Sequence, residues 1–206
     1  MSTGLLLVVS GPSGAGKSTL CQALIAKWPN LRYSVSCTTR PRREKEVDGR
    51  DYHFVSEDAF QKNIRDGKFL EWARVHDSFY GTLQEPLMEH LRQGLDVVLD
   101  VDPHGALSIK EKFADCVGVY ICPPTWESLE DRLRSRAQDD ELSISKRLAN
   151  ARKEMGYLSH YDYLVVNKVF RESLENLSAI LRAEHSRVKR LSHELTYLEI
   201  MEEEKA

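Results

Sequence analysis

A glycine-rich segment near the N-terminus joins an apolar run to a helix, and it leaves few folds open to this chain. Residues 4–10 read Gly-Leu-Leu-Leu-Val-Val-Ser, which is typical of a buried parallel strand. Residues 11–18 follow directly as Gly-Pro-Ser-Gly-Ala-Gly-Lys-Ser and match the pattern G-x-x-x-x-G-K-[ST]. The apolar residues from Leu20 to Trp28 then share one helical face. Strand, loop and helix together predict an α/β fold with a phosphate-binding loop.

The chemistry of this loop predicts a nucleoside triphosphate as ligand. Small residues let the backbone curl so that N–H groups converge on phosphate oxygens, and the helix N-terminus adds partial positive charge. Lys17 is expected to reach the β- and γ-phosphates, and the Ser18 hydroxyl to bind Mg²⁺. The alternative, a glycine-rich turn that contains Lys-Ser by chance, does not explain the flanking strand and helix. The predicted nucleotide-binding residues are Gly11, Pro12, Ser13, Gly14, Ala15, Gly16, Lys17, Ser18 and Thr19.

Apolar and amphipathic segments alternate along the rest of the chain. The patterns predict strands at residues 33–37, 69–75, 95–101, 117–122 and 163–166. Helices are predicted from Ser56 to about Gly67 and at residues 83–93, 126–136 and 143–158. This alternation indicates a parallel sheet with right-handed crossovers. The irregular, charged stretch 38–53 is long for a structural loop, which favours a functional role.

Charge and cysteine content narrow the class of protein. The formal net charge of −3 argues against a nucleic-acid partner, which usually requires a basic surplus. Four scattered cysteines form no C-x-x-C pair, which fits a reducing compartment and a cytoplasmic location. We expect no signal peptide, and no segment approaches the roughly 20 apolar residues of a membrane span. Small-molecule substrates are therefore the expected partners.

Five short segments carry a pattern more specific than the phosphate-binding loop. They are residues 34–43 (Ser-Val-Ser-Cys-Thr-Thr-Arg-Pro-Arg-Arg), 46–52 (Glu-Val-Asp-Gly-Arg-Asp-Tyr), 69–73 (Phe-Leu-Glu-Trp-Ala), 80–82 (Tyr-Gly-Thr) and 99–102 (Leu-Asp-Val-Asp). In order and spacing they closely resemble the guanylate kinase family, over nearly the whole chain. The resemblance implies a P-loop kinase core with a five-stranded parallel sheet flanked by helices, an inserted GMP-binding subdomain and a small helical lid.

The resemblance also implies how an acceptor nucleotide is held. The residues it assigns to the GMP phosphate are Arg40, Arg43, Tyr52 and Tyr80, and guanidinium forks and phenol hydroxyls suit phosphate oxygens. Those it assigns to the guanine are Ser36, Glu71, Thr82 and Asp102. A carboxylate can accept from both donors of the guanine edge, and a hydroxyl can donate to its O6. Asp100 resembles the acidic residue that lies near Mg²⁺ in P-loop enzymes and completes the acceptor set.

An arginine-rich segment resembles the family lid. Arg132, Arg136 and Arg147 match its phosphate-gripping arginines, whose charge would stabilise the transferring phosphoryl group. The alternative is a basic helix surface paired with its own acidic residues. Asn167 resembles the residue that packs near the ATP adenine, although asparagine is also an ordinary turn residue. Ala137 stands where relatives often have glycine.

The implied reaction is the transfer of the γ-phosphate of MgATP to GMP, and to dGMP, giving ADP and GDP in purine nucleotide metabolism. The implied catalytic residues are Lys17, Arg40, Arg136 and Arg147, and the implied Mg²⁺ ligands are Ser18 and Asp100. The implied organisation is a single domain over residues 1–206. It comprises a core (1–33, 91–130 and 149–206), a GMP-binding subdomain (34–90) and a lid (131–148).

Two other classes of protein share parts of this pattern. A P-loop kinase acting on a phosphorylated sugar would keep the loop but would need no guanine-reading Glu71. A guanylate-kinase-like scaffolding module would bind protein ligands, but such modules usually have a degraded loop, whereas Lys17 and Ser18 are intact here. Glu44 and Lys45 depart from the usual Pro-Gly of the family loop. Apolar residues spaced along 188–198 predict a C-terminal helix that packs on its own core, with a homo-oligomer contact as the alternative.

Overall fold

A five-stranded parallel sheet organises the computed structural model, which describes residues 4–44, 46–75, 77–135 and 141–191. Its strands are β1 (Leu6–Ser10), β2 (Leu31–Tyr33), β7 (Asp96–Asp100), β8 (Val117–Cys122) and β9 (Tyr163–Val166). Their order across the sheet is β2-β7-β1-β8-β9, and every neighbouring pair is parallel. The predicted five-stranded parallel sheet is confirmed.

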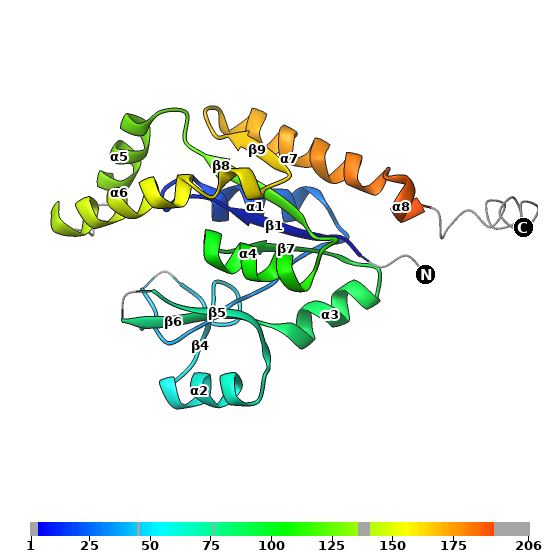
Figure 1. The fold of residues 1–206 in the computed structure, drawn as a ribbon, viewed down its shortest axis with the longest axis horizontal. Helices are drawn as coiled ribbons and strands as arrows, with labels where there is room; N and C mark the ends of the chain where they lie inside the picture. The colour runs from blue at the N-terminus through cyan, green and yellow to red at the C-terminus, as the bar shows by residue number, and fades with distance from the viewer. Residues whose placement is uncertain (1–3, 45, 76, 136–140, 192–206) are drawn as a thin grey trace, which may run out of the picture.

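Helices cover both faces of this sheet because its central strands are apolar on both sides. Along β1, Leu7 and Val9 face the side that is covered by α1 (Lys17–Lys27) and α7 (Phe170–His185). Leu6 and Val8 face the other side, which is covered by α3 (Gln84–Arg92) and α4 (Pro103–Lys112). The result is a three-layer core (Figure 1). The helices leave the carboxyl ends of the strands free to carry a site.

A second, smaller sheet is inserted between β2 and β7. Its order is β4-β3-β6-β5, formed by β3 (Cys37–Thr38), β4 (His53–Phe54), β5 (Phe69–Val75) and β6 (Ser78–Leu83). The helix α2 (Glu57–Arg65) begins at Ser56, whose side chain accepts a hydrogen bond from the Ala59 N–H. Phe60 packs on Phe69 and Phe79, so this unit has its own apolar core below the main sheet (Figure 1).

A helical pair lies on the opposite side of the main sheet from α2 (Figure 1). It consists of α5 (Trp126–Arg134) and α6 (Glu141–Met155), which pack through Leu129, Leu133 and Ala151. The Arg152 guanidinium also lies over the Trp126 ring. The short helices η1 (Leu158–His160) and α8 (Val188–Leu191) complete the described elements.

Most predicted elements are confirmed, and one predicted strand is wrong. Strands 69–75, 117–122 and 163–166 have the predicted bounds. Residues 33–37 are not one strand, because the chain leaves the main sheet after Tyr33 and enters the second sheet at Cys37. Residues 192–206 lie outside the described part of the chain, so the predicted oligomer contact there stays a prediction. Among the described residues, no helix is both long and apolar enough to cross a bilayer.

Candidate active site

The phosphate-binding loop follows β1 at the carboxyl edge of the main sheet and has a shape that only glycines allow. Gly11, Gly14 and Gly16 have φ values of 134°, 91° and 92°. A Cβ atom at Gly11 would lie 2.0 Å from the carbonyl oxygen of Ile121 in β8. Gly16 precedes α1, and no side chain caps this helix, so its first N–H groups are available to an anion.

Two side chains from distant parts of the chain brace this loop. The Asn167 amide, which is buried after β9, donates to the Ala15 carbonyl at 2.7 Å. The Arg132 guanidinium donates to the carbonyls of Ala15 at 3.4 Å and Asn167 at 2.8 Å. Neither residue is among the described residues that line the cavity beside the loop, and both contact the loop backbone. The direct nucleotide contacts that the resemblance implies for both residues stay a prediction.

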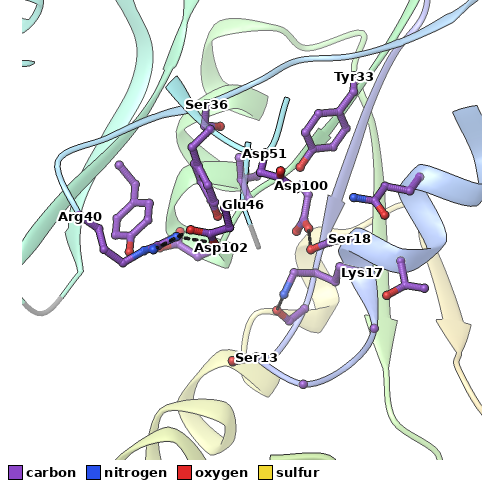
Figure 2. Close-up of a pocket in the computed structure, with 18 of the residues that line it drawn as sticks. Ser13, Lys17, Ser18, Tyr33, Ser36, Arg40, Glu46, Asp51, Asp100 and Asp102 are labelled. Carbon is purple, nitrogen blue, oxygen red and sulfur yellow. Dashed lines mark hydrogen bonds and ion pairs between the residues drawn. The ribbon is translucent and has the colours of Figure 1, made fainter. Parts of the chain in front are cut away.

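On the side of the cavity that the phosphate-binding loop forms lie the Lys17 ammonium and a pair made by the Ser18 hydroxyl and the Asp100 carboxylate (Figure 2). The Lys17 ammonium donates to the carbonyls of Gly11 at 2.8 Å and Pro12 at 3.3 Å. The Ser18 hydroxyl donates to the Asp100 carboxylate at 2.5 Å, at the end of β7. Hydroxyl and carboxylate oxygens suit Mg²⁺, which keeps waters and substrate phosphates as its other ligands. Among the described residues, no three acidic, histidine or cysteine side chains form a group that could hold a metal ion.

A single cavity of about 510 Å³ connects the loop to the second sheet. Arg147, from α6, also lines it, whereas Arg136 lies outside the described residues. Pro12, Ala15 and Thr82 are predicted site residues that do not line the cavity directly. The predicted site residues that the structure brings together around the cavity are Gly11, Ser13, Gly14, Gly16, Lys17, Ser18, Thr19, Ser36, Arg40, Arg43, Tyr52, Glu71, Tyr80, Asp100, Asp102 and Arg147.

Across the cavity from Lys17, a cationic and aromatic cluster forms the far wall (Figure 2). Arg40 follows β3, and its guanidinium lies 5.5 Å from the centre of the Tyr52 ring. The Tyr52 and Tyr80 rings meet edge to face at 5.9 Å. Burial raises the pKa of Tyr52 to about 12, so its hydroxyl stays a neutral hydrogen-bond donor at physiological pH. Guanidinium and phenol donors of this kind suit an anion with several oxygens.

Glu71, on β5, is a carboxyl group that the fold keeps away from water. Its side chain is buried, and its Oε1 accepts a hydrogen bond from the Thr82 hydroxyl at 2.6 Å. The Ser36 hydroxyl lies 3.4 Å from that of Thr82. Burial raises the pKa of Glu71 to about 7, and the hydrogen bond from Thr82 acts in the opposite direction. Asp102 contributes to the raised pKa, and its own carboxylate caps α4 by accepting from the Gly105 N–H at 2.8 Å.

Several cavity residues carried no prediction of their own. Glu46 stands within a motif segment, and Glu154 lies seven residues after Arg147, on the same face of α6. Burial raises the pKa of Glu154, against the opposing effect of nearby Lys17 and of a hydrogen bond from the Ser13 backbone. Helical spacing from Arg147 was the signal that could have found Glu154. The other cavity residues without a prediction are Gln22, Tyr33, Arg50, Asp51, Ala73, Gly81 and Val101.

A phosphate-binding loop on a five-stranded parallel sheet, facing a second anion-binding wall across one cavity, defines a nucleotide-dependent kinase of the P-loop class. The sequence model of the guanylate kinase family matches residues 3–184. The chain belongs to the guanylate kinase family.

Individual relatives agree with this assignment over most of their length. The chain is 46% identical over 200 residues to a guanylate kinase of Caldanaerobacter subterraneus subsp. tengcongensis, covering 97% of this chain and 96% of the relative. It is 43% identical over 187 residues to a guanylate kinase of Thermotoga maritima, covering 91% and 90%. The crystal structure of guanylate kinase from Anaplasma phagocytophilum matches with a TM-score of 0.79 and 32% identity, covering 94% of both chains.

Proposed function

We propose that the protein transfers the γ-phosphate of ATP to GMP, giving ADP and GDP. The observation that carries this proposal is the buried Glu71 carboxyl, which shares one cavity with the phosphate-binding loop. A carboxylate at this position can accept from both N1–H and N2–H₂ of guanine, while the Ser36 hydroxyl can donate to O6. Adenine presents the reverse order of donors and acceptors and would leave these groups unpaired.

The acceptor phosphate is assigned to the far wall of the cavity. Arg40 and Arg43 supply charged donors, and the hydroxyls of Tyr52 and Tyr80 supply neutral ones. The second pKa of a phosphate monoester is about 6, so the phosphate of GMP is largely dianionic at neutral pH and needs no general base. One of its oxygens attacks the γ-phosphorus of ATP. The bond to the β–γ bridging oxygen breaks, and that oxygen leaves with ADP.

The donor phosphates are assigned to the loop, where backbone N–H groups and the Lys17 ammonium meet them. Ser18 and Asp100 would hold Mg²⁺, which, when bound with ATP, neutralises charge on the phosphates. Lys17 now donates to loop carbonyls, so binding of the nucleotide exchanges those acceptors for phosphate oxygens. Catalysis then consists of alignment and charge neutralisation.

The last residues of α5 and the first half of α6 are proposed to belong to a lid that closes over the nucleotides. Arg147 already faces the cavity from α6, and Arg136 is expected to join it on closure. A closed lid would exclude water, which otherwise hydrolyses ATP. We propose residues 131–148 as this lid, 34–90 as the GMP-binding subdomain, and 1–33, 91–130 and 149–206 as the core. The boundary at 148 falls within the continuous helix α6.

The proposal extends to the setting of the reaction. The assigned residues bind the base and the phosphate, and none is assigned to the ribose, so dGMP is an expected second acceptor. We place the reaction in purine nucleotide metabolism in the cytoplasm, where ATP is available and the four thiols stay reduced.

The direct test is ADP release measured with MgATP and one acceptor at a time. GMP should support rapid turnover, whereas AMP, CMP, UMP and a phosphorylated sugar should not. Binding of GMP without turnover would instead favour a scaffolding module. Equal turnover with AMP would show that Glu71 does not select guanine.

A further inference from the structure

Glu46 holds one complete edge of the Arg40 side chain. Its Oε2 accepts from NH1 at 3.0 Å, and its Oε1 accepts from NH2 at 2.8 Å. The two side chains are only 16% and 18% exposed, so this pair is largely withdrawn from solvent. Glu46 Oε2 also accepts from the Arg43 backbone N–H at 2.8 Å. The carboxylate therefore ties Arg40 to the backbone of its own loop.

A count of donors shows which part of Arg40 is left for a ligand. The guanidinium has five N–H groups in a fixed plane. Two bind Glu46, and a third, on NH1, binds the Pro41 carbonyl at 2.8 Å. Beyond these three bonds, and apart from the nearby Tyr80 side chain, the described residues leave the Nε–H and the second hydrogen of NH2, which lie side by side on one edge. That edge is a second fork, suited to two oxygens of one phosphate.

Neighbouring aromatic rings restrict the same guanidinium in a second way. Its carbon lies 5.5 Å from the centre of the Tyr52 ring and 5.7 Å from that of Phe54. The Tyr80 side chain is also close enough to contribute to the raised pKa of Arg40, to which the hydrogen bond with Glu46 contributes most. Rings, carbonyl and carboxylate together leave the plane of the guanidinium little freedom. Figure 2 shows Glu46 beside Arg40.

We propose that Glu46 is a positioning residue: it fixes Arg40 by one edge so that the other edge meets the phosphate of the acceptor nucleotide. This inference rests on the proposed function. The competing role for Glu46 is that of an anionic placeholder, whose carboxylate occupies the phosphate position in the free protein and has to leave when GMP binds. The contacts of Glu46 argue against that role. A placeholder would have to leave when the phosphate binds, whereas Glu46 takes a different edge from the one left for the phosphate and is held by the Arg43 N–H as well.

The test compares Glu46→Gln with the matched control Glu44→Gln, which removes the same charge two residues away. Glu44 is exposed and does not line the cavity. In E46Q an NH₂ group faces one guanidinium nitrogen, so Arg40 loses its bidentate partner. We measure the affinities for GMP, guanosine and ATP by calorimetry, together with kcat and KM for GMP. Losing a charged hydrogen bond that orients a binding group should weaken GMP about 10- to 100-fold.

Guanosine separates positioning from general damage because it lacks the phosphate. E46Q should bind guanosine and ATP as wild type does, should raise KM for GMP, and should lower kcat because a misplaced acceptor reacts more slowly. E44Q should match wild type throughout. Glu46→Asp keeps the carboxylate and should bind GMP more tightly than E46Q does. If E46Q does not fold, Glu46→Asp takes its place in the comparison with wild type and E44Q.

Three results would overturn the inference. Tighter GMP binding by E46Q would identify Glu46 as a placeholder that competes with the phosphate. An equal loss for GMP and guanosine would mean that Glu46 only supports the fold of the loop. Unchanged GMP binding by a folded E46Q would mean that Arg40 needs no positioning. Failure of the wild-type protein to bind GMP would be a different result, because it would contradict the proposed function itself.

Discussion

Guanine binding should depend on pH through the buried carboxyl of Glu71. The pKa of this group is about 7 in the free protein, because burial disfavours its charged form. Guanine needs the ionised form, which accepts two hydrogen bonds, so binding at neutral pH must expel a proton from part of the population. Affinity should therefore rise as the pH rises and level off once Glu71 is ionised.

The size of this effect follows from the pKa. With a pKa of about 7, roughly one tenth of the protein is ionised at Glu71 at pH 6 and roughly nine tenths at pH 8. The apparent affinity should fall about tenfold between pH 8 and pH 6, which corresponds to about 1.4 kcal/mol. Near pH 7, binding should release about half a proton per ligand.

Calorimetry with guanosine is the suitable assay, because the phosphate of GMP itself titrates near pH 6. Titrations between pH 6 and pH 8, in buffers with different ionisation enthalpies, give both the affinity and the proton release. Glu71→Gln is the control. It should bind about 30-fold or more weakly, since one acceptor becomes a donor, and its affinity should not change with pH. A flat profile for wild type, or the same slope in E71Q, would refute the reasoning.

Three further predictions concern stability and the phosphate-binding loop. The pKa of Glu71 is raised from 4.5 to about 7, so the folded protein holds a proton that the unfolded chain releases. Wild type should therefore lose about 2.5 kcal/mol of stability relative to E71Q as the pH rises from 5 to 8, as urea unfolding would measure. The opposite trend would mean that Glu71 is stabilised as an anion. Lys17→Ala should lower turnover by several orders of magnitude with an unchanged Tm, whereas Lys27→Ala, an exposed change on the same helix, should not. A tenth of wild-type turnover in K17A would contradict the assigned role. Asn167→Ala removes the hydrogen bond to Ala15 and should weaken ATP about tenfold while GMP binds normally; an equal effect on both nucleotides would place Asn167 outside the donor site.

The main sheet could be predicted because its signals are local. Apolar runs such as Val117–Cys122 are buried on both faces, so the run itself predicts a strand without information on the strands that flank it. The strand β6 was missed because Ser78–Leu83 is mixed in polarity and only partly buried. Helix α4 was missed because its first turn contains Gly105, a poor helix former, although Pro103 suits the first helical position. Gly105 leaves room for Glu71, because a Cβ atom there would lie 3.0 Å from the Glu71 carboxylate, which is a tight contact that exists only in the folded chain.

In the candidate site, too, local sequence patterns could be predicted and contacts between distant residues could not. Its residues could be predicted as a set because motif order is a property of the sequence. Their contacts could not be predicted, because the bracing of Ala15 by Asn167 joins residues 152 positions apart. The raised pKa of Glu71 likewise arises from burial by the whole fold, and the pairing of Arg40 with Glu46 depends on how the side chains are oriented.

The central place of β1 in the sheet has a consequence for synthesis on the ribosome. The phosphate-binding loop emerges before β7 and β8, yet β1 pairs on one side with β7 and on the other with β8. The brace from Asn167 emerges later still. A nascent chain that already carries the complete motif therefore has no shaped loop until β7, β8 and Asn167 have also been made. During translation, the apolar residues of β1 must remain unpaired for longer than those of any later strand of this sheet.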